Sequence, residues 1–212
     1  MSSASSRHIH PWVFMVLIIP FGVVSGYVTV AIAYYLKQAG VSVGQVAGIV
    51  ALALLPHTWK FLWAPVIDAT LSQKTWYWIG AILTAVGIAL MGAMPPTKAG
   101  LAILSVVVFL TSSATSFIGM AVESLMAHAT PEELKGRAGG WFQAGNLGGS
   151  GIGGGLGLWL TQNLAAAWLA GVIVAVLCFL CALALFLLPE TGRSHPPGGL
   201  VTGLKSSIQD LW

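Results

Sequence analysis

The chain has 212 residues, of which 57% are hydrophobic and 7% are charged, and its formal net charge at pH 7 is +3. A soluble domain carries about 25% charged residues to keep its surface hydrated, so this composition excludes an ordinary water-soluble protein and predicts a lipid bilayer around the chain. The nine Lys and Arg residues are scattered singly instead of clustering, and we therefore expect no nucleic acid as a partner.

Six apolar segments predict membrane-spanning helices, because a helix rising about 1.5 Å per residue needs about 20 residues to cross about 30 Å of hydrocarbon. We expect them at residues 12–36, 43–67, 76–94, 101–126, 138–160 and 167–188. The connections between them are short, which makes consecutive helices antiparallel neighbours. The predicted fold class is therefore all-α, a polytopic transmembrane helical bundle with about six spanning helices.

The second segment contains two ionisable residues, His57 and Lys60, three positions apart. Lys60 precedes Asp68 by eight residues, and a helical rise places it about 12 Å inside that end of the segment. A lone charge in hydrocarbon costs several kcal/mol, so a lysine at this depth is a candidate site residue. His57 neighbours Lys60 on the helix surface and is a further candidate.

The fourth segment supplies an acidic residue, Glu123, at a depth comparable with that of Lys60. One interpretation is an ion pair or a shared aqueous cavity. The alternative is that Lys60 extends along its stem to the headgroups while Glu123 faces the water of the loop. Ser112, Ser116, Gly119 and Glu123 share one helix face at about 100° per residue, which fits either a solute path or close helix packing.

The fifth segment is rich in glycine, with eleven glycines among the 22 residues 136–157. Spacings such as Gly145 to Gly149 allow two helix backbones to approach closely in a membrane. So many glycines also weaken a helix, which is consistent with a segment that bends or slides during a conformational cycle, although packing alone explains them equally well. Asn146, three residues after Gln143, is a candidate for a polar group that faces a cavity.

The end of the chain has a different composition. Residues 189–212 begin with prolines and glycines typical of a linker and continue with a stretch compatible with either a short amphipathic helix or a disordered tail. We therefore predict a six-helix bundle at residues 1–188 and a cytoplasmic linker or tail at 189–212. Cys178 and Cys181 precede this boundary within an apolar run, where we interpret them as small apolar side chains.

Lys and Arg residues predict the orientation of the bundle. With the amino terminus inside, the cytoplasmic segments hold six of them and the external loops hold two. We therefore expect both termini in the cytoplasm. At this side Asp68 and Arg137 each end a helix where opposite charges can latch neighbouring loops, so they are candidates for a cytoplasmic gate; solvated loop charges are the alternative.

Two blocks of sequence resemble AmpG-like permeases of the major facilitator superfamily. The run KFLWAPVID at residues 60–68 is similar to the end of their second helix, where such a run leads into an Asp that helps to latch the cytoplasmic side. Glu123, the loop Pro131-Glu132-Glu133 and the glycine-rich fifth segment resemble the acidic fourth helix, the PEE-type loop and the glycine-rich fifth helix of the family. The likeness extends over residues 12–188.

The sequence departs from this family in the fourth helix. Relatives usually carry an Asp there and often a second acidic residue four positions earlier, whereas this chain has Glu123 and Gly119. Because the second carboxylate is missing, we do not assign a proton-coupled muropeptide importer. A coupling proton is kept as a candidate partner.

The resemblance implies a secondary active transporter in the inner (cytoplasmic) membrane that moves a small-molecule solute by alternating access of two six-helix halves. This chain would be the amino-terminal half, either truncated or paired with a second half on the same or another chain. The substrate or coupling candidates are Lys60, Glu123, His57, Ser112, Ser116 and Asn146, and the gate candidates are Asp68 and Arg137.

Two other classes of function are alternatives to a transporter. The main alternative is a non-transporting membrane subunit or a remnant of a transporter. An intramembrane enzyme would need a motif such as HExxH, GxSxG or a pair of Asp residues, and the sequence has none. We therefore expect no catalytic residues, no metal and no cofactor.

Overall fold

The computed structural model describes residues 10–60, 67, 70–95 and 97–188, and all regular secondary structure in this part of the chain is helical. The elements are α1 (Trp12–Gly26), η1 (Tyr27–Ile32), α2 (Ala33–Gln38), α3 (Val43–Thr58), α5 (Gln73–Ala93), η2 (Lys98–Gly100), α6 (Leu101–Ala129), η3 (Glu132–Leu134), α7 (Lys135–Gly151), η4 (Ile152–Leu156), α8 (Gly157–Asn163), α9 (Ala167–Cys181) and η5 (Ala182–Leu187). The predicted linker or tail at 189–212 lies outside the described residues.

Four helices are long and apolar enough to cross a membrane, at Trp12–Gln38, Gln73–Ala93, Leu101–Ala129 and Trp168–Leu187. They correspond to the first, third, fourth and sixth predicted spans. The other two predicted spans are also helical: α3 is a shorter apolar helix, and the glycine-rich helix runs from α7 through η4 into α8. The all-helical membrane fold is confirmed, and a total of six spans stays a prediction.

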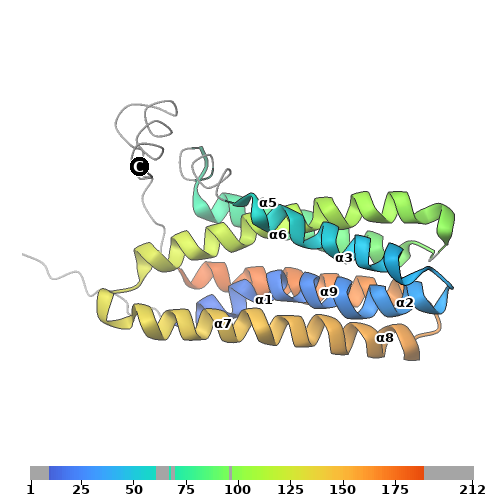
Figure 1. The fold of residues 1–212 in the computed structure, drawn as a ribbon. Coiled ribbons are helices and arrows are strands. Elements are labelled where there is room, and N and C mark those ends of the chain that lie inside the picture. The colour runs from blue at the N-terminus through green and yellow to red at the C-terminus, as the bar shows by residue number, and fades with distance from the viewer. Residues whose placement is uncertain (1–9, 61–66, 68–69, 96, 189–212) are drawn as a thin grey trace, which may run out of the picture.

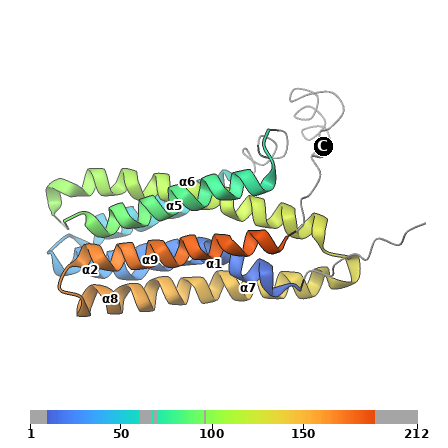
Figure 2. The same cartoon turned by 180° about the vertical axis from the view of Figure 1, so that it is seen from behind.

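The helices lie side by side in one bundle (Figures 1 and 2). Helices α3, α5 and α6 form one side, α1 and α9 lie in the middle, and α7 with α8 forms the opposite side. Helix α1 packs against both α7 and α6, α3 packs on α6, and α5 contacts α6 and α9. The start of α1, the α6–α7 connection and the end of η5 lie at one end of the bundle, as expected for consecutive antiparallel helices (Figure 1).

Local sequence explains where several helices begin. The Ser42 hydroxyl accepts the backbone N–H of Gln45 at 3.4 Å, and the Gln45 side chain accepts the backbone N–H of Ser42, which forms a capping box at the start of α3. Ser72 caps α5 by accepting the N–H of Thr75 at 3.1 Å. Gly40, with φ of +77°, makes the turn between α2 and α3 in a backbone region that favours glycine.

The second helix ends earlier than the sequence predicts. We expected one segment at residues 43–67, but α3 ends at Thr58, and Trp59 has a φ of −101° and a ψ of 8°. Pro56 lies in the last turn, where it lacks an N–H donor and crowds the preceding turn, so it weakens the helix at this point. Lys60 is helical again, and thus follows a break instead of continuing α3.

Glycines bring α1 and α7 into direct backbone contact. Gly145, Gly149 and Gly153 on α7 and its continuation touch the backbone of α1, and Gly22 and Gly26 on α1 touch the backbone of the glycine-rich helix. A Cβ atom added at any of these five positions would overlap a carbonyl oxygen of the opposite helix. The close approach predicted from the glycine spacing is therefore confirmed, and its partner is the first helix.

We call the contact made by Gly22, Gly26, Gly145, Gly149 and Gly153 the glycine seam. Both of its helices contain a π-helical turn, and the two turns, η1 and η4, pack against each other. A backbone hydrogen bond to the carbonyl five residues earlier closes each turn. In η1 the Ala33 N–H donates to the Val28 carbonyl, and in η4 the Gly157 N–H donates to the Ile152 carbonyl. A π-helical turn holds one residue more than an α-helical turn, so it rotates all following side chains relative to the preceding ones. The seam therefore changes its helical register at matching heights in both helices.

The outer surface of the bundle is apolar. Phe186 of η5, Leu147 of α7, and Ile103 and Leu110 of α6 are each between 60% and 74% exposed. In water, so many exposed large apolar side chains would promote aggregation, whereas in a bilayer they contact lipid chains. The exposed apolar surface agrees with the membrane placement predicted from composition.

A pair of adjacent glycines tests the seam. We expect Gly149→Ala to destabilise the bundle by about 1 to 3 kcal/mol, because its Cβ would lie 2.5 Å from the Ile19 carbonyl oxygen and the backbones would have to separate. Gly148→Ala is the matched control, because its Cβ would meet nothing within 4 Å and alanine favours a helix by up to about 1 kcal/mol. Unfolding of the purified variants in SDS, followed by tryptophan fluorescence, measures both. Equal stability of the two variants would contradict the seam.

Candidate functional site

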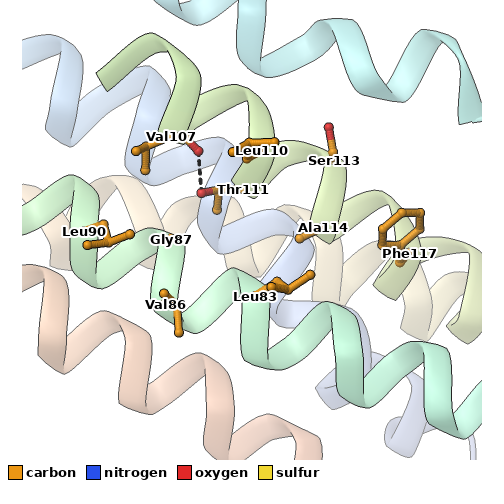
Figure 3. A pocket seen from close by; sticks show the side chains of 10 residues that line it. All are labelled: Leu83, Val86, Gly87, Leu90, Val107, Leu110, Thr111, Ser113, Ala114 and Phe117. Carbon is orange, nitrogen blue, oxygen red and sulfur yellow. Dashed lines mark hydrogen bonds between the residues drawn. The ribbon is translucent and has the colours of Figure 1, made fainter. Parts of the chain in front are cut away.

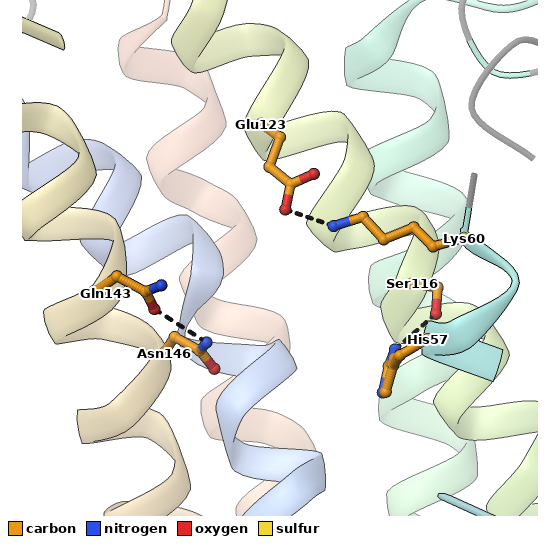
Figure 4. Close-up of polar contacts among 6 residues, drawn as sticks. All are labelled: His57, Lys60, Ser116, Glu123, Gln143 and Asn146. Atoms are coloured by element: carbon orange, nitrogen blue, oxygen red, sulfur yellow. Dashed lines mark hydrogen bonds and ion pairs between the residues drawn. The ribbon is translucent and has the colours of Figure 1, made fainter. Parts of the chain in front are cut away.

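Lys60 and Glu123 form an ion pair. Lys60 follows the break at the end of α3, and Glu123 lies on α6. The Lys60 Nζ and the Glu123 Oε1 lie 2.5 Å apart, and the two side chains are 29% and 43% exposed, respectively (Figure 4). The sequence left open whether the two charges pair or whether each faces water separately. In the structure they form an ion pair. Glu123 is six residues before the end of α6, which is about 9 Å along the axis, so the pair is placed near the end of the bundle that holds the α6–α7 connection.

His57 and Ser116 form a second contact between α3 and α6. The His57 Nδ1 lies 2.8 Å from the Ser116 Oγ, and this hydroxyl donates to the Ser112 carbonyl oxygen at 3.1 Å (Figure 4). A serine hydroxyl has a single proton, and Ser116 donates its proton to the Ser112 carbonyl. The Ser116 oxygen therefore accepts a hydrogen bond from His57, and a neutral His57 carries its ring proton on Nδ1. The Nε2 atom of His57 is left as an acceptor for another group.

The polar stripe of α6 continues inward from Ser116. Ser112 is 1% exposed, and its hydroxyl has no hydrogen-bond partner among the described residues. A buried hydroxyl without a partner costs about 1 to 3 kcal/mol, so this serine is an unfavourable residue for packing alone. Ser112, Ser116 and Glu123 thus lie along one face, as the helical spacing predicted.

Asn146 lies apart from these contacts, on α7. Its side-chain amide donates to the Gln143 Oε1 at 3.3 Å, so these two α7 side chains pair with each other (Figure 4). Figure 4 shows α1 between this amide pair and the residues of α3 and α6. The structure therefore separates the candidates into two groups, with Lys60, His57 and their partners on one side of α1 and Asn146 on the other.

The predicted gate is described only in part. Arg137 is exposed near the start of α7, at the end of the bundle that holds the α6–α7 connection. Asp68 lies outside the described residues, so the latch between them stays a prediction. Nearby, Lys135 and Glu132 form an ion pair of 2.6 Å on the surface, with 47% and 80% of the side chains exposed.

One aromatic residue of this region was not predicted. The Phe21 ring of α1 lies 4.8 Å from the His57 ring, measured between centroids, with an angle of 48° between the planes. It also contacts α6, because a Cβ added at Gly119 would lie 3.3 Å from two carbon atoms of the Phe21 ring. No polar atom or motif marks Phe21 in the sequence, since a phenylalanine in an apolar helix resembles any other core residue.

A groove on the outer side of the bundle is separate from these residues. It has a volume of about 410 Å³ and lies between α5 and α6, with Leu83, Val86 and Leu110 among its lining residues (Figure 3). Its two hydroxyls are already bonded within α6: Thr111 donates to the Val107 carbonyl at 2.7 Å, and Ser113 donates to the Phe109 carbonyl at 2.8 Å. The groove contains none of the candidate site residues and offers no free polar group to a solute.

The fold and these contacts define a multi-pass membrane protein whose apolar helices carry a few polar and charged side chains that contact one another. Residues 13–209 match the model of the Major Facilitator Superfamily, and the chain therefore belongs to this family of membrane transporters. A search of curated proteins finds no match to the chain. Membership of the superfamily, predicted from the sequence, is confirmed, and the AmpG-like type stays a prediction.

A double-mutant cycle tests the ion pair. With Lys60→Met and Glu123→Gln made singly and together, we expect a coupling free energy of about 1 kcal/mol, because the pair is only partly exposed and short. The exposed Lys135–Glu132 pair is the matched control, with a coupling of about 0.2 to 0.5 kcal/mol. The coupling is measured from SDS unfolding curves. Additive effects of the two Lys60–Glu123 substitutions would argue against the pair.

Proposed function

We propose that this chain forms one six-helix half of an AmpG-like secondary transporter, which moves a small solute across the inner membrane by alternating access. The observation that supports this most directly is the Lys60–Glu123 ion pair of 2.5 Å within a bundle of apolar helices. Charged side chains are rare at such positions and typically belong to the path of a solute or an ion. Membership of a transporter superfamily agrees with this role.

We propose that Glu123 couples transport to a proton. Its carboxylate is stabilised by Lys60 while it is ionised, and protonation would remove the attraction and release the lysine. The freed Lys60 could then attract an anionic or strongly polar group of the solute. His57 adds a free ring nitrogen at the next turn, so a solute leaving Lys60 would meet a hydrogen-bonding partner one turn further along the bundle.

The proposed orientation places both termini in the cytoplasm. The ion pair would then lie near the cytoplasmic side, with Asp68 and Arg137 forming the gate of that side. In superfamily members, the substrate lies at the interface of two halves near the middle of the membrane. We propose that a second six-helix half, on the same or another chain, covers the face that carries Lys60, His57 and Glu123.

Uptake measurements test the proposed function. Membrane vesicles from cells that produce the protein are incubated with an isotope-labelled mixture of cell metabolites under an imposed pH gradient, and the accumulated solutes are identified by mass spectrometry. We expect Glu123→Gln to reduce proton-driven accumulation by about tenfold or more, because the variant cannot be charged and discharged. Glu132→Gln is the control, since Glu132 is an exposed residue of η3 in the α6–α7 connection.

The comparison with vesicles that lack the protein distinguishes a transporter from a non-transporting membrane subunit. If vesicles with the unmodified protein accumulate no solute above those without it, the transporter proposal fails and a non-transporting subunit is favoured. If both glutamate variants lose accumulation equally, Glu123 has no special part in coupling. Immunoblots of the vesicles establish that the variants are present in equal amounts.

A further inference from the structure

The two contacts between α3 and α6 follow each other along the bundle. His57 meets Ser116, and Lys60 meets Glu123, so each contact joins one residue near the end of α3 to one residue of α6. Ser116 lies 13 residues before the end of α6 and Glu123 lies six residues before it, which places them about 20 Å and about 9 Å from that end. The Lys60–Glu123 pair is thus an outer polar position, and the His57–Ser116 contact is an inner one.

Gly119 lies between these positions on the same face of α6, three residues after Ser116 and four before Glu123. The missing side chain leaves room that the Phe21 ring of α1 occupies, since a Cβ added at Gly119 would lie 3.3 Å from the Cδ2 and Cε2 atoms of the ring. The same ring lies 4.8 Å from the ring of His57. An apolar ring is therefore packed against α6 at the height that separates the inner from the outer polar position.

We propose that Phe21 is an apolar barrier between the two polar positions, and that Gly119 provides the space for it. A phenyl ring offers no hydrogen-bond donor or acceptor, and a constriction lined by such a side chain interrupts a chain of water molecules. In this proposal, a polar species at Lys60 and Glu123 must displace the ring before it reaches the buried Ser116, which is 2% exposed. This inference extends the proposed transport path, but the contacts of the Phe21 ring with Gly119 and His57 do not depend on whether the protein moves a solute.

A structural role for Phe21 gives a different expectation. Phe21 packs against a buried apolar cluster that contains Phe14, seven residues earlier on the same helix. If Phe21 only filled space, replacing it would loosen the bundle as replacing Phe14 does, without opening a specific route. A useful test must therefore distinguish a local opening at Ser116 from a general loss of packing.

Cysteine accessibility makes this distinction without any solute. In a full-length protein with Cys178 and Cys181 replaced by Ala, Ser116→Cys reports on the inner position, and Ala127→Cys reports on an exposed site near the end of α6. A small membrane-impermeant thiol reagent is added to sealed vesicles from one face at a time. The face from which Ala127→Cys reacts identifies the side of the outer position.

We expect Phe21→Ala to raise the reaction rate of Ser116→Cys from that face by about tenfold, with the rate at Ala127→Cys unchanged. Phe21→Leu keeps an apolar side chain and should leave the Ser116→Cys rate within about twofold of the unmodified barrier. Phe14→Ala is the control for general loosening and should not raise the rate. Should Phe21→Ala fail to accumulate in the membrane, Phe21→Gln keeps a longer side chain than Ala and, because that side chain is polar, is expected to admit the reagent as well.

Two results would overturn the barrier. In the first, the Ser116→Cys rate is the same with Phe21 as with Phe21→Ala or Phe21→Gln. In the second, Phe14→Ala raises the rate as much as Phe21→Ala does, which would assign Phe21 a packing role alone. Because the reaction with the thiol reagent needs neither solute nor pH gradient, these results are independent of the outcome of the uptake measurements.

Discussion

Direct backbone contact between α1 and the glycine-rich helix organises this bundle. In a membrane, lipid chains are as apolar as leucine, so helices gain little from hiding apolar side chains and associate through close van der Waals packing instead. At the five seam glycines, no side chain of the glycine itself separates the two backbones. Helix α1 is thereby fixed on one side by α7, and its opposite side is free to contact α6 and α9.

The same central helix provides the aromatic side chain at the candidate site. One face of α1 meets α7 through Gly22, and the preceding residue, Phe21, points its ring at Gly119 and His57. Successive residues of a helix differ by about 100° in direction, so packing at Gly22 determines where Phe21 points. A shift of α1 along the glycine seam would therefore move the Phe21 ring relative to both polar contacts. The paired π-helical turns lie in the same two helices and change their register together.

The interface of α3 and α6 differs from the seam in its chemistry. It is held by a hydrogen bond and an ion pair, and both involve ionisable side chains close to the break that follows Thr58. Polar contacts of this kind are compatible with exchange of partners, because a water molecule or a solute group can replace one of them. In the glycine seam, no water molecule or solute group can replace the contact between the two backbones. The bundle thus combines one interface that resists separation with another whose contacts can be exchanged.

Composition and periodicity alone determined much of this architecture. The apolar spans, the glycine spacing that predicts a close helix contact and the polar stripe of α6 depend on residues near each other in sequence, and local geometry is the same in any helix. The superfamily could be inferred from the run at 60–68 and the residues around Glu123, because these segments are continuous in the chain. The early end of α3 was missed because a proline in an apolar run ends some helices and only bends others.

Tertiary structure decided which of these features meet. His57 and Ser116 are 59 residues apart in sequence, and Lys60 and Glu123 are 63 apart, so their contacts depend on the relative rotation and height of two helices. That arrangement results from packing over the whole bundle and is not encoded at any single position. For the same reason Asn146 proved to lie across α1 from the other candidates, while Phe21, which carries no polar atom, lies between the two polar contacts.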